Sequence, residues 1–452
     1  MTSKTDTPAT VIVGLGDSGL SVAKYLASTG ATFKIVDSRL NPPGLAEIRR
    51  VLPQIEIELG DFKLATLQAA DQLIVSPGVS LKTPAIIAAR KRGVEVSGDI
   101  DLFAKRATAP IIAITGSNGK STVTALVAEI LRCANVSFGL GGNLDGANFK
   151  PALNLLQEGE KEFYVLELSS FQLETTQRLN AAVAVILNIS PDHMDRYESL
   201  DEYRQAKQRI FLGCQQTLVN RDDISGHPQA GVGVDQWSFG TGAPGKRMVG
   251  IVQVAGEDYL ATSAERILPV RELKIIGQHN VLNALAAMAL TLAIGIDKDS
   301  IATALREFKG LPHRCQWVAR KQNVDYYNDS KGTNVGATMT AIEGLGQQLP
   351  GRVVLIAGGI AKGADFSSLV PVVKKWVKAL ILIGQDAKQI AALFSTDMQI
   401  EFADDMDSAV HSAQKHTLIG DAVLLSPACA SFDMFDNFQH RGQMFVKAVE
   451  NL

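Results

Sequence analysis

The sequence has few cysteines, no long apolar run and no excess of either charge. Its 452 residues include four cysteines that lie far apart, so we expect neither a disulfide framework nor a zinc knuckle. No stretch approaches the roughly 18 apolar residues of a membrane helix, and the polar residues 1–10 predict no secretory signal. Lys and Arg number 44 against 47 Asp and Glu, and this balance argues against a nucleic-acid-binding or membrane-surface protein. These absences predict a cytoplasmic protein with reduced thiols.

The sequence does contain enough apolar material for several buried cores. Hydrophobic residues make up 46% of the chain and charged residues 20%, and a length of 452 residues predicts about three domains. Strand-like apolar runs alternate with helical patterns in 10–98, in 110–190 and again in 352–427, which favours parallel sheets covered by helices. Short β-rich pieces with many turns lie between these segments, in 222–271. We therefore predict an α/β fold with a Rossmann-like domain at 1–107, a central domain at 108–310 and a second Rossmann-like domain at 311–452.

A glycine-rich turn directly follows the apolar run at 111–114 and precedes a helical pattern. Its sequence, TGSNGKST, lets successive backbone N–H groups and a helix N-terminus converge on phosphate oxygens. Lys120 is placed to reach the β- and γ-phosphates of a nucleotide, and Ser121 to bind magnesium. The strict pattern requires glycine where the chain has Ile114, so an ordinary glycine-rich turn is the alternative. The turn predicts a P-loop-type ATP-binding central domain, with phosphate contacts from Gly116, Ser117, Asn118, Gly119, Lys120, Ser121 and Thr122.

Two polar side chains follow strands that should lie beside this turn. Glu167 ends an apolar run, and His193 comes soon after the run at 182–187. Because ligands of α/β folds bind at the carboxyl ends of parallel strands, Glu167 is a candidate for holding the magnesium of the nucleotide. A neutral imidazole of His193 could serve as a second metal ligand. The alternatives are a solvated carboxylate at a strand end and a hydrogen-bonded structural histidine.

A second glycine motif lies near the start of the chain. Gly14, Gly16 and Gly19 form a G-x-G-x-x-G pattern after an apolar run, and Asp37 ends the next run, 21 residues after Gly16. This pattern is typical of dinucleotide-binding folds, in which the acidic residue binds a ribose. Taken alone, it favours a nicotinamide or flavin dehydrogenase. Together with the Lys120 turn, it suits an enzyme that uses ATP on a substrate that itself carries a nucleotide.

Longer blocks of sequence carry a resemblance to a known family. In chain order they are TGSNGKST, LELSSFQLE, NISPDHMDRY, YRQAKQRIF, GQHNVLNALAA, GLPHRC, NDSKGTN and LSPACASFDMFDNFQHRG. Together they resemble the Mur ligases, the ATP-dependent amino-acid ligases of peptidoglycan precursor synthesis, over essentially the whole chain. The last two blocks are most similar to the member that adds D-glutamate to UDP-N-acetylmuramoyl-L-alanine through an acyl phosphate. The D-N-P-R and H-H-P stretches of the sibling ligases are absent from the sequence. The resemblance implies a part in cell-wall biogenesis, cell shape and cell division.

The resemblance implies roles for individual residues at the ATP site. The catalytic residues would be Lys120, Glu167, His193 and Lys207. The ligands of two magnesium ions would be Ser121, Glu167, His193 and Lys207. In the family this last lysine is typically carbamylated, whereas from the sequence itself Lys207 reads as a solvated helix lysine. The residues near the adenine, the ribose and the phosphates of ATP would include Asn280, Asn283, Arg314 and Asp329.

The resemblance also implies where the two other substrates bind. The uridine substrate would be held by residues of the first and central domains, namely Gly16, Ser18, Asp37, Ser38, Arg39, Ser76, Gly78, Asn143 and His193. D-Glutamate would contact residues of the third domain, namely Lys331, Thr333, Lys362, Ser431 and Phe438. Gly332 and the GGIAKGADF loop, which carries Lys362, differ from the commonest family variants. We expect the third domain to close over the central one during the reaction.

The expected partners are small molecules: ATP, UDP-N-acetylmuramoyl-L-alanine and D-glutamate. No nucleic acid or membrane is expected to bind, and the chain is expected to act as a monomer. Three alternatives stay open. A folylpolyglutamate synthetase shares the phosphate-binding turn and the added C-terminal domain but lacks a uridine-binding front domain. A dehydrogenase would use the Gly14 loop without ATP, and a nucleotide switch would bind ATP without turnover.

Overall fold

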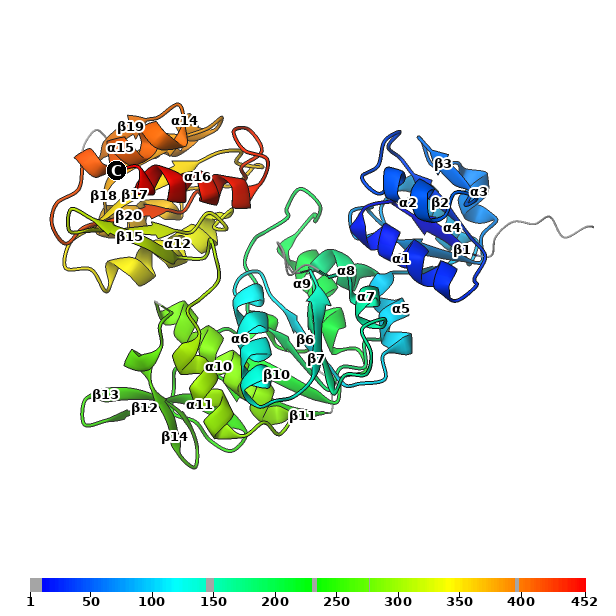
Figure 1. Ribbon diagram of the computed structural model, residues 1–452, viewed down its shortest axis with the longest axis horizontal. Helices are drawn as coiled ribbons and strands as arrows, with labels where there is room; N and C mark the ends of the chain where they lie inside the picture. The colour runs from blue at the N-terminus through cyan, green and yellow to red at the C-terminus, as the bar shows by residue number, and fades with distance from the viewer. Residues whose placement is uncertain (1–9, 144–149, 230–233, 276, 395–397) are drawn as a thin grey trace, which may run out of the picture.

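The computed structural model describes residues 10–143, 150–229, 234–275, 277–394 and 398–452. The chain folds into three lobes, each built around its own sheet, with the N-terminal and C-terminal lobes on opposite sides of the central one (Figure 1). This arrangement confirms the three-domain α/β fold predicted from the sequence. Most of the segment 1–10, on which the expectation about a secretory signal rests, lies outside the described residues. No described helix combines the length and the apolar character that a membrane crossing requires.

The N-terminal lobe is a parallel sheet of five strands in the order β3-β2-β1-β4-β5. The strands are β1 (Thr10–Val13), β2 (Phe33–Asp37), β3 (Ile57–Leu59), β4 (Gln72–Val75) and β5 (Glu95–Ser97). The helices between them are α1 (Asp17–Ser28), α2 (Leu45–Val51), α3 (Leu64–Gln68) and α4 (Pro84–Lys91). The strand order reverses between β1 and β4, and open α/β sheets bind ligands beyond such a point. The Gly14 loop and the loop after β4 meet there.

A bridging helix, α5 (Asp99–Arg106), leads from the first lobe into the central one and packs against both. Its partners are α1, α7 (Ala152–Leu155) and α8 (Ser170–Thr175). The ring of Phe103 lies edge-on to that of Tyr164, with their centroids 5.0 Å apart. One continuous buried cluster contains apolar residues from β1, α5, α7 and β8. The first two lobes therefore share a hydrophobic core.

The central sheet places three loops side by side. Its nine strands have the order β14-β13-β12-β11-β10-β9-β6-β8-β7. The parallel strands are β6 (Ile111–Thr115), β7 (Phe138–Gly142), β8 (Phe163–Glu167), β9 (Val183–Ile186), β10 (Gln216–Asn220), β11 (Asp235–Phe239) and the start of β12 (Met248–Val254). Two antiparallel strands, β13 (Glu257–Thr262) and β14 (Arg266–Pro269), complete the sheet. Because β6 pairs in parallel with β8 and β9, the loops after these three strands meet at one edge.

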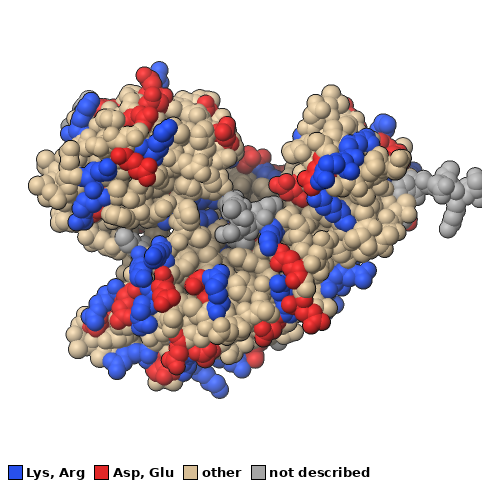
Figure 2. Space-filling view, in the orientation of Figure 1, with Lys and Arg blue, Asp and Glu red and all other residues tan. Residues whose placement is uncertain are grey.

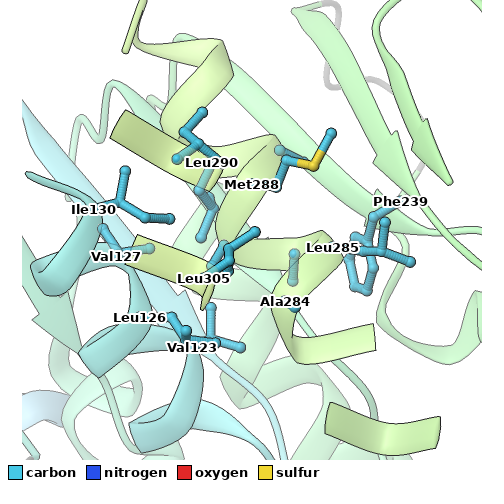
Figure 3. Packing of buried hydrophobic residues seen from close by; sticks show 14 of the residues in the cluster. Val123, Leu126, Val127, Ile130, Phe239, Ala284, Leu285, Met288, Leu290 and Leu305 are labelled. Carbon is cyan, nitrogen blue, oxygen red and sulfur yellow. The ribbon is translucent and has the colours of Figure 1, made fainter. Parts of the chain in front are cut away.

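Three helices cover one face of the central sheet. They are α6 (Lys120–Cys133), α10 (Gln278–Ala293) and α11 (Lys298–Glu307). Side chains of α6 such as Val123 and Val127 face Ala284 of α10 and Leu305 of α11 in a closely packed cluster (Figure 3). Burial of such side chains stabilises the fold by about 25 cal/mol for each Å² of apolar surface removed from water. This packing fixes the start of α6, and with it the glycine-rich turn, against the start of α10.

The C-terminal lobe has a six-stranded sheet in the order β15-β16-β20-β17-β18-β19. The strands are β15 (Gln316–Lys321), β16 (Val324–Asn328), β17 (Val353–Gly358), β18 (Val377–Ile383), β19 (Gln399–Phe402) and β20 (Ala422–Leu425). The helices are α12 (Val335–Gly346), α13 (Leu369–Trp376), α14 (Ala387–Ala391), α15 (Met406–Lys415) and α16 (Phe438–Glu450). The sheet is parallel except for β15, which pairs antiparallel with β16 as an edge hairpin. The expected Rossmann-like lobe thus carries one antiparallel edge strand.

Candidate active site

The glycine-rich turn between β6 and α6 has a conformation that needs glycine. Gly119 has φ +83° at the N-cap of α6, in the left-handed region that side chains other than glycine rarely adopt. A Cβ atom at Gly119 would lie 2.5 Å from the Oδ1 atom of Asn283 in α10. Asn283 in turn donates a hydrogen bond to Asn280 Oδ1 (3.0 Å). The structure therefore places Asn283 against the turn and Asn280 beside Asn283.

The turn is held in place by the loop that follows β9. The backbone N–H of Ser117 donates to the carbonyl oxygen of Asn188 (3.0 Å), and that of Asn118 to Asn188 Oδ1 (2.9 Å). The hydroxyl of Ser117 donates to the carbonyl oxygen of Ser190 and accepts from its N–H. Asn188 and Ser190 were not predicted as site residues, although both stand in the NISPDHMDRY block. Their polar side chains directly after a buried strand were the available signal.

Two lysines converge on the turn from different helices. The Nζ atom of Lys120, at the start of α6, donates to the carbonyl oxygens of Gly116 and Ser117, both at 2.9 Å. The Nζ atom of Lys207, in α9 (Leu200–Gln208), donates to the same Gly116 oxygen (2.9 Å) and to Thr115 Oγ1 (3.2 Å). Lys207 is 1% exposed, so it is not a solvated helix lysine. Burial, and next the positive charge of Lys120, hold the pKa of Lys207 well below its ordinary value.

Glu167 lies at the end of β8 with its carboxylate buried. Its Oε1 atom accepts a hydrogen bond from Asn143 Nδ2 (3.2 Å), while Oε2 has no hydrogen-bond partner among the described residues. Glu167 is 1% exposed, so the alternative of a solvated carboxylate is wrong. A buried carboxylate oxygen without a partner is costly unless a cation or a donor occupies it. The donor set thus fits magnesium, which is commonly held by one or two carboxylates together with phosphate oxygens.

A protein-only metal cage is not present in the described part of the chain. No group of three or more His, Cys, Asp and Glu side chains converges there as a metal ligand set. The hydroxyl of Ser121 is buried at the start of α6 beside Lys120, and the neighbouring Thr122 is also buried. The described carboxylate and imidazole side chains alone therefore do not complete a metal site at this edge of the sheet, and a magnesium ion would need further oxygen ligands.

His193 lies near both lysines, and its side chain is exposed. Its ring packs against the ring of Phe171, with the centroids 4.8 Å apart. Burial lowers the pKa of His193, the carboxylate of Asp192 raises it, and the positive charges of Lys120 and Lys207 lower it further, with a net lowering. The imidazole is therefore held in its neutral form at neutral pH, as a metal ligand must be.

A cavity of ≈ 420 Å³ lies between the first and central lobes. Eight of the nine residues expected to hold the uridine substrate line it, namely Gly16, Ser18, Asp37, Ser38, Arg39, Ser76, Gly78 and Asn143. His193, the ninth, lies outside this lining. Gln172 of α8 also lines the cavity and was not predicted, although it stands in the LELSSFQLE block. Asn143 both lines the cavity and contacts Glu167, so the cavity adjoins the edge of the sheet that carries the glycine-rich turn.

The carboxylate of Asp37 accepts hydrogen bonds from neighbouring residues of the first lobe. Its Oδ2 atom accepts from the backbone N–H of Leu15 (2.6 Å) and from Arg39 Nη2 (2.7 Å), and Oδ1 accepts from Arg39 Nε (2.9 Å). Burial raises the pKa of Asp37, but the hydrogen bonds from Arg39 and Leu15 outweigh it and hold the pKa below the usual value. Asp37 thus fixes the Gly16 loop and positions Arg39 at the cavity.

The C-terminal lobe reaches the glycine-rich turn through Arg314. Its Nη2 atom donates to Ser121 Oγ at 2.7 Å. Asp329, also expected at the ATP site, is buried behind Arg314 and accepts hydrogen bonds from Cys315 N (3.0 Å) and Ser426 Oγ (2.7 Å). Burial raises the pKa of Asp329 to about 7. The two residues thus lie on the side of the lobe that faces the turn.

The residues expected to hold D-glutamate lie on neighbouring loops of the C-terminal lobe. Lys331 lies over the ring of Phe438, with its Nζ atom 4.1 Å from the centroid. The backbone N–H of Thr333 donates to the carbonyl oxygen of Lys331 (2.8 Å). Ser431 is buried, and its neighbour Phe432 lies 5.9 Å from the Nζ atom of Lys362. Lys362 has φ +51°, so its loop is held in an uncommon backbone conformation.

A buried arginine that was not predicted ties these loops together. Arg441 of α16 is fully buried and donates from Nε to Ser330 Oγ (3.0 Å), from Nη2 to the Ser330 carbonyl oxygen (2.8 Å) and from Nη1 to that of Cys429 (3.1 Å). Burial lowers the pKa of Arg441 to about 10, so it remains cationic. It therefore links the loops that carry Lys331 and Ser431 to the helix that begins at Phe438. Its place in the FDNFQHRG stretch was the only signal in the sequence.

Comparison with known families matches all three lobes. The model described as "Mur ligase MurD-like, N-terminal domain" matches residues 8–98, "Mur ligase middle domain" matches 114–291, and "Mur ligase, glutamate ligase domain" matches 313–429. Among curated proteins, the UDP-N-acetylmuramoylalanine–D-glutamate ligase of Pseudomonas aeruginosa is 51% identical over 98% of both chains. The protein of the same name from Nitrosococcus oceani is 48% identical over 98% of this chain and 96% of its own.

Solved structures share the fold at much lower identity. The UDP-N-acetylmuramate–alanine ligase MurC of Thermotoga maritima has a TM-score of 0.58 at 20% identity, covering 98% of this chain and 99% of its own. The MurF ligase of Thermotoga maritima, solved in complex with ADP, has a TM-score of 0.62 at 16% identity, covering 98% and 95%. At these identities the likeness concerns the three-lobed fold alone.

Proposed function

Because this chain belongs to the Mur ligase family, we propose that it joins D-glutamate to UDP-N-acetylmuramoyl-L-alanine in a reaction driven by ATP. The observation that carries the proposal is the position of Asn143. This residue lines the cavity that carries the residues expected to bind the uridine substrate, and its amide also contacts Glu167 beside the glycine-rich turn. A substrate in the cavity would therefore reach the γ-phosphate of a nucleotide on the turn.

The energetic need for ATP follows from the chemistry of the carboxylate. A carboxylate is a poor acyl donor because its leaving group would be oxide. Transfer of the γ-phosphoryl group from ATP to the alanine carboxylate gives an acyl phosphate and ADP. The amine of D-glutamate then attacks the acyl carbon, the C–N bond forms, and phosphate leaves with the loss of a proton from nitrogen.

The residues at the turn fit the first transfer. Lys120 would exchange the carbonyl oxygens of Gly116 and Ser117 for phosphate oxygens, which carry more negative charge. Arg314 would bring a second cation from the C-terminal lobe. Magnesium, when bound, would neutralise phosphate charge, and Ser121, Glu167, His193 and Lys207 are the residues that would hold two such ions. Asn280 and Asn283 would lie near the base.

Lys207 is suited to carbamylation because its amine is buried and its pKa is held well below the ordinary value, which favours the neutral form. A neutral amine can attack carbon dioxide, forming an N–C bond and releasing a proton, which converts the side chain into an anionic oxygen ligand. The lowered pKa of Lys207 supports this step, and a buried cation beside Lys120 would otherwise be unfavourable. We propose that the modified side chain serves the second magnesium ion together with His193.

Positive and hydroxyl side chains on the C-terminal lobe fit an amino acid with two carboxylates. Lys331 and Lys362 would supply the cations, and Thr333 and Ser431 the hydroxyl donors. Phe438 would pack against the aliphatic part of D-glutamate, beside Lys331. Closure of this lobe would exclude the water that hydrolyses an acyl phosphate.

Phosphate release from ATP tests the proposal. The full chain is mixed with ATP, magnesium and UDP-N-acetylmuramoyl-L-alanine, and single amino acids are added in turn. We expect release above background with D-glutamate and much less with L-glutamate or D-alanine. The proposed third substrate is wrong if D-glutamate gives no more phosphate than buffer. Release that does not need the uridine substrate would point instead to a different ligase.

A further inference from the structure

Asp99, at the first turn of the bridging helix α5, is a buried carboxylate without a partner. It is 2% exposed, and neither of its oxygens has a hydrogen-bond partner among the described residues. Burial raises the pKa of Asp99 to about 6. Burial of an unpaired carboxyl group lowers the stability of a fold, and such a group in a native structure calls for an explanation.

The surroundings of Asp99 connect it to the cavity between the lobes. The groups that lower its pKa include the backbone N–H of Ile100, the hydroxyl of Ser18 from the Gly16 loop and the amide of Gln172 from α8. All of them lie near the carboxyl group, but none has the geometry of a hydrogen bond to it. Ser18 and Gln172 line the cavity. A side chain at Gly98 would clash with Thr175, so the start of α5 fits closely against α8 and the position of Asp99 is fixed. Asp99 therefore lies behind two residues of the cavity wall, Ser18 of the first lobe and Gln172 of the central lobe.

The oxygen of the Gln172 amide group already accepts hydrogen bonds within the N-terminal cap of its own helix. Its Oε1 atom accepts hydrogen bonds from the N–H (3.0 Å) and the hydroxyl (3.1 Å) of Ser169 in the capping box of α8. The Nε2 group must therefore point away from Ser169, and its two hydrogens are available for Asp99 and for a ligand.

We propose that Asp99 is a positioning residue for the uridine substrate, and that its carboxyl group takes up the Ser18 hydroxyl and the Gln172 amide when the cavity is filled. The substrate would draw the two wall residues together across the lobe boundary, and the carboxyl group would gain the partners that it lacks. The second Nε2 hydrogen of Gln172 would then be directed to an acceptor oxygen of the substrate. This inference rests on the proposed function, because it takes a uridine nucleotide as the ligand.

Matched substitutions on α5 test the inference. Asp101 has the same side chain and the same 2% exposure two residues further along the helix. Its Oδ1 atom accepts from the backbone N–H of Gln177 (2.7 Å), its Oδ2 atom has no partner among the described residues, and Gln177 does not line the cavity. In the full chain, Asp99→Asn is expected to raise KM for UDP-N-acetylmuramoyl-L-alanine about tenfold, the size expected for one lost charge-assisted hydrogen bond. The kcat and the KM for ATP should stay within about twofold of wild type, because the turn is untouched. Asp101→Asn is expected to lower Tm without changing that KM.

The outcomes separate the inference from the proposed function. A wild-type chain that releases no phosphate with D-glutamate overturns both. An active wild type with an unchanged KM in Asp99→Asn, or an equal rise of KM in both variants, overturns the inference alone. If Asp99→Asn does not fold, Asp99→Glu takes its place, since it keeps the acid but displaces it by one methylene. The same rise of KM is expected, and an unchanged value contradicts the proposal.

Discussion

Lys120 and Lys207 illustrate how single residues prepare the turn for an anion. The side-chain amines of both lysines donate to the carbonyl oxygen of Gly116, so two basic groups approach one point of the backbone. Burial, and next the positive charge of Lys120, holds the pKa of Lys207 well below its ordinary value. A phosphate group at the turn would neutralise the positive charge of Lys120.

The first prediction concerns the buried amine of Lys207. Its folded-state pKa lies below the unfolded value, so the unfolded chain binds more protons between these two values and the free energy of unfolding rises with pH across that window. Lys207→Met removes this unfavourable burial, and we expect a Tm at least about 2 °C higher at pH 7.5, in buffer free of carbon dioxide. The gain should shrink as the pH approaches about 10. Scanning calorimetry at both pH values measures it.

The same variant should lose activity although it is more stable. We expect phosphate release to fall at least about a hundredfold, because the proposed metal site would lose a ligand. Lys246→Met, at an exposed lysine, is the control and should change neither Tm nor rate. A lower Tm for Lys207→Met at pH 7.5 would contradict the argument from burial.

At the scale of elements, strand order explains why residues far apart in the chain meet. The strand order β9-β6-β8 brings the ends of these strands, and with them His193, Lys120 and Glu167, to one edge of the sheet. The helices α6 and α10 then clamp the turn, because Gly119 touches Asn283 where a side chain would not fit. The glycine-rich turn is thus fixed by packing against α10 as well as by its place at the start of α6.

The second prediction follows from this close approach. Gly119→Ala forces a Cβ atom against Asn283 at φ +83°, so either the turn or the start of α10 must shift. We expect kcat/KM for ATP to fall about a hundredfold, since displacements near 1 Å at a reacting group have effects of this size. Gly242→Ala, where the added atom meets nothing within 4 Å, should keep full activity. Initial rates at varied ATP concentration measure kcat/KM for each variant. Equal values for the two variants would contradict the idea that contact between Gly119 and Asn283 holds the turn in place.

The helix α16 acts in a similar way on the C-terminal lobe. Its buried Arg441 holds two loops by three hydrogen bonds, and a lysine cannot reproduce this planar set of donors. The third prediction is that Arg441→Lys destabilises the chain by about 3 kcal/mol and raises KM for D-glutamate about tenfold or more. The KM for the uridine substrate should not change, because that cavity lies on other lobes.

Denaturant unfolding and phosphate-release kinetics measure these effects. Lys447→Met, at an exposed position of the same helix, serves as the control. An unchanged KM for D-glutamate in a folded Arg441→Lys protein would show that Arg441 supports the helix only.

At the scale of the whole molecule, the lobes are joined unequally. The first and central lobes share a core through α5, whereas the C-terminal lobe meets the central one through polar contacts such as Arg314–Ser121 and through the close approach of Gly277 to Gly344. Figure 2 shows the C-terminal and N-terminal lobes as separate bodies above the central one, with both charges interspersed over their surfaces. The C-terminal lobe is therefore the one expected to move.

The fourth prediction is that this lobe closes when substrates bind. With a non-hydrolysable ATP analogue and the uridine substrate, the radius of gyration should fall toward the value of about 22 Å for a compact chain of this length. Small-angle scattering with and without both ligands measures the change. Identical curves in the two states would contradict closure, and the uridine substrate alone should leave the radius nearly unchanged.

The sequence alone was enough to predict the glycine-rich turn, the Gly14 fingerprint and the three-domain α/β class, because these features depend on local chain geometry. A glycine such as Gly119 is favoured where the backbone adopts a positive φ, and alternating apolar runs indicate a parallel sheet covered by helices. Both rules follow from backbone sterics and strand pairing, which are the same in any α/β protein. The tertiary structure alone decided that Lys207 is buried, that Asp37 binds its own loop, that Arg441 ties two loops and that Asp99 stands unpartnered behind the cavity. Each of these depends on which distant segments surround a side chain, and burial and electrostatic environment arise only when those segments pack together.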